Sequence, residues 1–172
     1  MADVILVDEN DTPAGTMEKM EAHQKGVLHR ALSIFIFNSK GEMLLHQRAL
    51  DKYHSGGLWT NTCCSHPLPG EENKSAAIRR LKEEMGFETA INEVFTFIYK
   101  TSVGNGLTEH EFDHVFTGVY DGEIKADKNE VMDFSYRTMA AIETLLQTQP
   151  TSFTEWFRIA FPKIKEQVSN KT

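Results

Sequence analysis

Two acidic residues, Glu109 and Glu111, are the first pair in the chain that could support chemistry. They lie within 107–120, where apolar and polar residues alternate as in a strand, so both carboxylates should share one face. Neighbouring carboxylates repel each other unless a proton or a cation lies between them. From the spacing alone, a strand face that is simply exposed to solvent is the favoured interpretation, and the histidines shift the balance toward a cation site.

Three histidines could join this acidic pair: His23, His29 and His66. Three imidazoles and two carboxylates would suit Zn²⁺, Mn²⁺ or Fe²⁺, and the carboxylates favour Mn²⁺ over a thiolate-type zinc site. No spacing matches a zinc finger, and each histidine alone also fits an ordinary surface or core residue. A metal site is therefore a hypothesis that depends on the fold bringing five side chains together.

Cys64 is the candidate reactive thiol. It follows Cys63 directly, at the end of a strand predicted over 58–62, and His66 lies two residues further on. Neighbours on an extended segment point to opposite sides, so only Cys64 should share the side of His66. We predict that Cys63 is a small packing residue, and a core position is the simpler alternative for Cys64 as well.

A helix is predicted over 73–85. Ile78, Leu81 and Met85 recur there at helical spacing, and Gly86 suits the left-handed cap that ends a helix. Arg80 and Glu84 lie four positions apart on this helix, and Arg79 and Glu83 form a second such pair. An ordinary amphipathic helix with two surface ion pairs would show the same spacing.

The stretch 65–87 resembles the Nudix box with two changes. Ser65 replaces a glycine, and Arg80 replaces a glutamate that binds metal in Nudix hydrolases. The planar guanidinium of arginine matches phosphate geometry, whereas the lost carboxylate weakens a hydrolytic metal centre. This exchange favours a site that grips a diphosphate without hydrolysing it.

Taken together, three features make the chain similar to the type 1 isopentenyl-diphosphate delta-isomerases. They are the segment Trp59-Thr60-Asn61-x-Cys63-Cys64-Ser65-His66-Pro67, the pair Glu109-x-Glu111 and the altered Nudix box. The similarity extends over about 4–156. It implies a single Nudix-like domain over 1–172, and an isomerase that interconverts isopentenyl and dimethylallyl diphosphate in isoprenoid biosynthesis. The reaction would proceed by protonation and deprotonation through a carbocation.

The resemblance also implies roles for individual residues. The ligands of one divalent metal, Mn²⁺ or Zn²⁺, would be His23, His29, His66, Glu109 and Glu111. Cys64 and Glu111 would be the acid–base pair on opposite faces of the substrate, with Tyr99 supporting the glutamate. Glu84 and the carbonyl of Cys64 would bind Mg²⁺ together with the substrate diphosphate. The substrate-binding residues would be Lys19, Arg48, Lys52, Arg80 and Trp156.

Composition limits the remaining choices. The chain has 172 residues, 40% of them hydrophobic, and a net charge of −7, which fits one globular domain and argues against a nucleic-acid partner. No apolar run reaches membrane-spanning length, and no signal-peptide pattern is visible. With two adjacent cysteines, these features favour a reducing cytoplasm and a small-molecule substrate. The oligomeric state and the identity of the metal stay open.

The remaining elements follow from periodicity and turn residues. Strands are predicted over 4–7, 28–37, 43–48, 94–101, 107–120 and 131–136, with 28–37 and 43–48 forming a hairpin. Helices are predicted over 16–24, capped by Thr16, over 140–147, and from Thr151 or Ser152 onward, with Pro162 kinking or ending the last helix. The pattern indicates an α/β fold, a mixed sheet with helices on its faces.

Two other functions remain open at this point. A Nudix pyrophosphohydrolase would share the box, but Arg80 argues against it, and the histidines would have no role. A non-catalytic metal-binding or interaction module would not need Cys64, Tyr99 and Trp156 in register with the metal site. An assay that follows both isomerisation and phosphate release separates the three.

Overall fold

The computed structural model describes residues 2–169, so the predicted domain 1–172 includes Met1 and 170–172, which lie outside the described range. Its strands are β1 Asp3–Val7, β2 Pro13–Glu18, β3 His29–Phe37, β4 Met43–Arg48, β5 Trp59–Thr60, β6 Cys63–Ser65, β7 Ile91–Gly104, β8 Leu107–Val119 and β9 Val131–Arg137. Its helices are α1 Lys19–Lys25, α2 Asn73–Met85, α3 Met139–Thr148, the 3₁₀ turn η1 Pro150–Ser152 and α4 Glu155–Ser169. This is the predicted mixed sheet with helices on both faces.

Strand β3 is the centre of the sheet. It pairs in parallel with β8, which places His29 opposite Glu111, and in antiparallel fashion with β6, which places Ser33 opposite Cys64. Strand β7 covers the other edge of β8 and places Tyr99 opposite Glu111. The pairing therefore brings into one region of the sheet residues that are far apart in the sequence.

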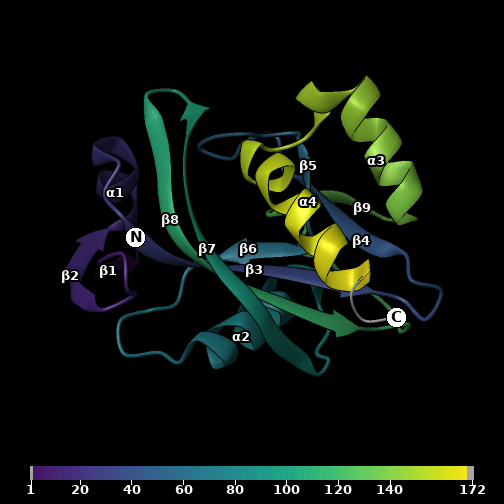
Figure 1. Ribbon diagram of the computed structural model, residues 1–172, viewed down its shortest axis with the longest axis horizontal. Helices are drawn as coiled ribbons and strands as arrows, with labels where there is room; N and C mark the ends of the chain where they lie inside the picture. Colours follow the sequence, from purple (N-terminus) through teal and green to yellow (C-terminus); the bar gives the residue numbers. More distant parts are fainter. Residues whose placement is uncertain (1, 170–172) are drawn as a thin grey trace.

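Two apolar cores lie on opposite faces of β3. Leu32 and Ile34 pack in the core under α2, whereas Phe35 packs with Phe157 of α4 on the other face. Figure 1 shows α2 on one side of the sheet and α3 and α4 on the other. The alternation follows from the two-residue period of a strand, and it leaves β3 buried on both sides.

The predicted helix over 16–24 is wrong at its start. Residues up to Glu18 form β2, where Thr16 pairs with Ile5 of β1, so tertiary pairing overrides the local cap signal. Helix α1 begins at Lys19, and the carboxylate of Glu18 accepts hydrogen bonds from the backbone N–H groups of Met20 and Glu21, at 3.0 and 2.9 Å.

The predicted hairpin of 28–37 with 43–48 is confirmed only at its turn, where Phe37 pairs with Met43 in antiparallel fashion. Strands β3 and β4 meet only through Phe37 and Met43, because Thr62 lies between them. The hydroxyl of Thr62 donates to the carbonyl of Leu44 at 2.7 Å and accepts from the N–H of Ile36 at 2.9 Å. The expected strand over 58–62 is consequently shortened to β5, which pairs with β4, and the separate strand β6 follows it and pairs with β3.

Helix α2 has the predicted bounds, and Gly86 ends it in the left-handed conformation with φ of 75°. Helix α4 instead starts later than predicted, at Glu155, and continues through Pro162 to Ser169. Pro162 is exposed, so its missing N–H falls on the solvent side, where the helix tolerates the loss. In residues 2–169 no helix combines the length and apolar character required to cross a bilayer.

Candidate active site

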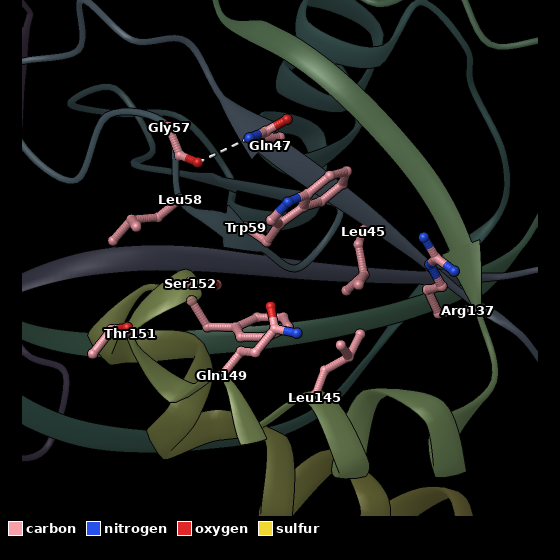
Figure 2. Close-up of a pocket in the computed structure, with 11 residues that line it drawn as sticks. Leu45, Gln47, Gly57, Leu58, Trp59, Arg137, Leu145, Gln149, Thr151 and Ser152 are labelled. Atoms are coloured by element: carbon pink, nitrogen blue, oxygen red, sulfur yellow. Dashed lines mark hydrogen bonds between the residues drawn. The ribbon is translucent and has the colours of Figure 1, made fainter. Parts of the chain in front are cut away.

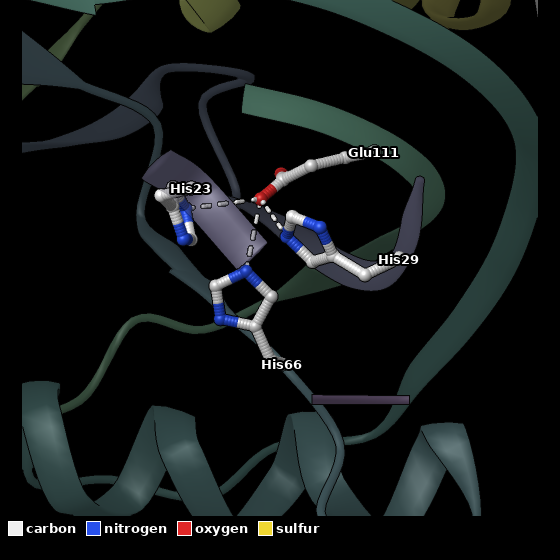
Figure 3. Close-up of side chains that lie close together, drawn as sticks. All are labelled: His23, His29, His66 and Glu111. Carbon is white, nitrogen blue, oxygen red and sulfur yellow. Dashed lines mark hydrogen bonds and ion pairs between the residues drawn. The ribbon is translucent and has the colours of Figure 1, made fainter. Parts of the chain in front are cut away.

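Four of the predicted metal ligands meet at one carboxylate oxygen. Oε2 of Glu111 lies 3.0 Å from Nε2 of His29, 2.9 Å from Nε2 of His66 and 3.8 Å from Nε2 of His23. Figure 3 shows the three imidazoles converging on Glu111 from α1, from the start of β3 and from the segment after β6. Their donor atoms all lie within 4.8 Å of one another, as the ligands of a single ion require.

Two of these imidazoles are held in place by main-chain carbonyls. Nδ1 of His23 donates to the carbonyl of Lys19 at 2.7 Å, and Nδ1 of His29 donates to that of Val27 at 2.8 Å. Each ring therefore turns a bare Nε2 toward Glu111. Metal-binding histidines are generally held in this way, with the second ring nitrogen hydrogen-bonded to the protein.

Glu109, the fifth predicted ligand, lies beside this group. Its Oε2 is 3.6 Å from Nε2 of His23, and its Oε1 is 3.0 Å from the hydroxyl of Tyr99, which also lies 2.5 Å from Oε1 of Glu111. Burial and the charge of Glu111 raise the pKa of Glu109. Burial also opposes ionisation of Glu111, but His66 and His29 outweigh it and lower that pKa well below its usual range. Two buried carboxylates this close favour a bound cation.

The donor set fits a divalent metal on structural grounds. Nε2 of His23 is fully buried and has no hydrogen-bond partner among residues 2–169, so a metal would satisfy an otherwise costly polar atom. Imidazole and carboxylate ligands suit Zn²⁺ and Mn²⁺.

His54 supplies a fourth imidazole beside this group, and the sequence pattern did not predict it. His54 is 2% exposed, and its Nε2 lies 3.6 Å from Oε2 of Glu109. Burial and the nearby Arg48 lower its pKa to about 3, so the ring is neutral at physiological pH. The signal for it was weak, since a lone histidine in the loop between β4 and β5 carries no spacing pattern.

Cys64 faces the same region as the imidazoles. Its sulfur lies 3.0 Å from Oδ1 of Asn61 and 3.0 Å from Nε1 of Trp156, which donates to it. Burial raises the pKa of this thiol, and the carboxyl of Asp113 raises it further. The group is therefore held as a neutral thiol, with its proton directed at Asn61.

Cys63 points to the opposite side of β6, as predicted. It is completely buried in the core under α2, and its thiol donates to Oε1 of Glu84 at 3.1 Å. Both cysteines are free thiols.

A narrow cavity of about 40 Å³ joins the thiol to the carboxylates. It is lined by Ser33, Arg48, Tyr53, His54, Cys64, Ser65, His66, Tyr99, Glu109, Glu111 and Trp156. The guanidinium carbon of Arg48 lies 5.1 Å from the centre of the Trp156 ring. The Cys64 thiol, the two carboxylates, the ring of Trp156 and the imidazoles of His54 and His66 thus line one cavity.

Comparison with known proteins shows the family of the chain. The NUDIX domain model matches residues 27–157. Isopentenyl-diphosphate Delta-isomerase of Pectobacterium atrosepticum is 51% identical over 166 residues, which cover 96% of this chain and 93% of that protein. Isopentenyl-diphosphate Delta-isomerase 2 of Aromatoleum aromaticum is 47% identical, and the match covers 94% of this chain and 85% of that protein. The chain belongs to the isopentenyl-diphosphate Delta-isomerase family.

Solved structures show the NUDIX fold of this family member. A Deinococcus radiodurans protein superposes with a TM-score of 0.78 at 14% identity, covering 94% of this chain and 98% of that one. A MutT protein from Methanosarcina mazei gives a TM-score of 0.67 at 20% identity, covering 84% and 96%. At these identities the likeness extends to the fold alone.

In this isomerase-family chain, the predicted basic residues converge beside the cavity. Arg48 lies over the ring of Trp156, and Arg80 donates to Ser65, both of which line the cavity. Burial lowers the pKa of Lys19, and the charges of Lys52, Arg80 and Arg48 lower it further. Lys19 and Lys52 flank the ring of Tyr53, with their nitrogens 4.8 and 5.8 Å from its centre. Such a cluster in a net-acidic chain suits a highly charged anion.

Two of these cations are partly neutralised by nearby acids. Arg80 donates to Glu84 at 2.6 Å and to the hydroxyl of Ser65 at 2.8 Å, and Lys52 lies 2.6 Å from Glu130. Glu130 is a second residue that the sequence did not single out. The predicted ion pairs on α2, Arg80 with Glu84 and Arg79 with Glu83, are both present.

A second cavity of this protein, of about 420 Å³, lies between β4, β5 and α3 (Figure 2). Gln47, Trp59 and Arg137 are among its lining residues, and the hydrogen bond from Gln47 to the carbonyl of Gly57 closes one edge. Its described lining residues include no acid, histidine or cysteine. The chemistry-bearing groups therefore belong to the narrow cavity at the imidazole cluster.

Proposed function

We propose that the protein interconverts isopentenyl diphosphate and dimethylallyl diphosphate, as an enzyme of isoprenoid biosynthesis. The observation that carries the proposal is that the Cys64 thiol and the Glu111 carboxylate, from different strands, line one narrow buried cavity. Membership of the isopentenyl-diphosphate Delta-isomerase family supports the same reaction.

The reaction moves a double bond by two proton transfers. A proton is added to the terminal carbon of the alkene, which leaves a tertiary cation, and another proton is removed from the carbon nearer the diphosphate. Cys64 and Glu111 serve as the two proton-transfer groups, one giving and one taking in each direction. Tyr99, within 2.5 Å of Glu111, positions that carboxylate.

Three features of the cavity suit a carbocation. Tyr99, Glu111 and Trp156 in its walls are buried, which limits the water that would quench the cation. The ring of Trp156 lines the cavity and contacts Cys64 through its indole N–H, and an aromatic face stabilises a desolvated cation by about 2 kcal/mol or more. Trp156 comes from the first turn of α4, so this helix closes the cavity.

A divalent metal, Mn²⁺ or Zn²⁺, completes the proposed site, with His23, His29, His66, Glu109 and Glu111 as its ligands. The ion would supply the positive charge that holds two adjacent buried carboxylates in their ionised form. The unpartnered Nε2 of His23 and the converging imidazoles support this set.

The diphosphate lies, in this proposal, against Lys19, Arg48, Lys52 and Arg80. A common binding region is supported by their contacts with the cavity lining: Lys19 and Lys52 lie over Tyr53, Arg48 lies over Trp156, and Arg80 donates to Ser65. Glu84 and the carbonyl of Cys64 would hold a Mg²⁺ ion shared with the diphosphate. Glu84 suits that role because it is nearly buried and faces both Arg80 and β6.

We also propose that the enzyme works in the cytoplasm on this small-molecule substrate. Two free cysteines, one of them in the catalytic pair, fit a reducing compartment.

Incubation with isopentenyl diphosphate tests the function directly. We expect dimethylallyl diphosphate to form with no release of phosphate, and with deuterium in the new methyl group when the solvent is D₂O. Phosphate release without isomerisation would instead support a Nudix pyrophosphohydrolase, and inertness of well-folded protein would support a binding module.

A further inference from the structure

His54 is a buried imidazole for which the proposed reaction has no use. It lies in the loop between β4 and β5, yet it is 2% exposed. Its Nε2 has no hydrogen-bond partner in the described part of the chain. A buried polar nitrogen of this kind is costly unless a ligand satisfies it.

The ring of His54 is oriented like the rings of His23 and His29. Its Nδ1 lies 3.0 Å from the hydroxyl of Ser55, which is able to accept the Nδ1 proton, and in that tautomer Nε2 is bare. That bare nitrogen points at the imidazole cluster, with its closest carboxylate atom being Oε2 of Glu109. An imidazole anchored through one nitrogen and bare at the other is prepared to bind a metal.

The position of His54 agrees with membership of the same cluster. Its ring centre lies 5.9 Å from that of His23, a separation matched by the 5.8 Å between His23 and His66. Nε2 of His54 and Nε2 of His23 are both 3.6 Å from Oε2 of Glu109, and these three donor atoms lie within 4.8 Å of one another. Neighbouring ligands of an ion with bonds of about 2.1 Å lie roughly 3 Å apart, so these three atoms require only a small inward movement. His23 belongs both to this group and to the group formed with His29, His66 and Glu111, and it therefore connects His54 to the rest of the site.

We infer that His54 is a sixth ligand of the divalent metal, bound through Nε2 on the side of Glu109. The inference rests on the metal site of the proposed function and extends it to four imidazoles and two carboxylates. It explains why two buried nitrogens, in His23 and His54, flank the same carboxylate oxygen.

Six protein donors would leave the ion without an open position. Hydrolytic metal centres keep such a position for water, whereas closed centres hold structure and charge. A closed ion fits an isomerase that must keep water from its carbocation. Binding to the ion would also fix the ring of His54, which packs edge-on against Trp156 at 5.7 Å between ring centres.

Packing is the competing explanation for His54, because its ring also contacts Tyr53 at 4.4 Å between centres. A packing role would leave the number of metal-bound nitrogens unchanged when the side chain is replaced. Counting those nitrogens therefore separates the two roles.

The experiment uses the full-length protein loaded with Mn²⁺ and labelled with ¹⁵N-histidine. Electron–nuclear double resonance should count four histidine nitrogens in the wild type and three in His54→Gln, and His54→Gln should bind Mn²⁺ at least tenfold more weakly. His46→Gln is the matched control, because His46 is buried on β4 with its Nδ1 held by the carbonyl of Thr62. It should retain four nitrogens and wild-type affinity.

Three histidine nitrogens in the wild type would overturn the inference without any variant. The inference would also be overturned if Glu111→Gln lost Mn²⁺ binding while His54→Gln bound Mn²⁺ as the wild type does. That result would leave the proposed five-ligand metal site intact. If neither variant altered Mn²⁺ binding, the metal site itself would be refuted. Turnover of isopentenyl diphosphate tests the proposed function separately from all of these results.

Discussion

The indole nitrogen of Trp156 lies 3.0 Å from the sulfur of Cys64, although 92 positions separate the two residues in the sequence. The contact connects the first turn of α4 to the centre of the sheet at β6. It directs an aromatic ring and a thiol into one cavity, where the proposed reaction needs a cation-stabilising face next to a proton-transfer group.

Replacement of Trp156 tests this arrangement. Trp156→Phe keeps a ring but loses the N–H that donates to Cys64, so we expect reduced yet measurable turnover. Trp156→Leu loses the ring face as well, and the removal of about 2 kcal/mol of cation–π stabilisation should lower the rate roughly a further 30-fold. Turnover measured by conversion of isopentenyl diphosphate gives both values. Equal rates in two well-folded variants would reduce Trp156 to a packing residue.

Glu109→Gln should lower metal content and activity while leaving the fold intact. Gln keeps the shape and the contact with Tyr99 but removes a negative charge next to His23 and Glu111. Metal analysis of the purified variant, compared with the wild type, measures the effect. Wild-type metal content together with wild-type turnover would show that Glu109 is not a ligand.

Arg80→Ala should weaken substrate binding. The change removes a partly buried guanidinium, and the loss of one charged hydrogen-bonding contact to the diphosphate costs roughly 1.5–3 kcal/mol. The expected result is a raised KM for isopentenyl diphosphate. Arg79→Ala is a matched control, because Arg79 pairs with the acids Glu71 and Glu83, whereas Arg80 donates to Ser65 in the cavity lining. Unchanged kinetics in Arg80→Ala would refute the assignment.

The two cysteines should respond differently to replacement. Cys64→Ala removes a proposed proton-transfer group and should stop deuterium entry from D₂O into dimethylallyl diphosphate. Cys63→Ala should retain activity and lose only about 1 kcal/mol of stability, since it removes a buried sulfur and its contact with Glu84. Thermal unfolding and turnover of both variants check this difference. A well-folded but inactive Cys63→Ala protein would reverse the assignment.

Local periodicity determined several features of this protein before any tertiary contact was known. The helical spacing of Leu81 and Met85, with Gly86 after them, set the bounds of α2. The two-residue period of β8 put Glu109 and Glu111 on one face. These features follow from the local backbone, because the periods of a helix and a strand fix which side chains share a face.

Tertiary structure decided the pairing of the strands and the position of His54, because local sequence signals did not determine either of them. Thr16 is an acceptable helix cap, yet pairing with Ile5 draws it into β2. Thr62 separates β3 from β4 and moves Cys64 opposite Ser33, a result of long-range hydrogen bonds that no local pattern records. His54 has no spacing partner in the sequence, so only the folded loop places its imidazole beside Glu109.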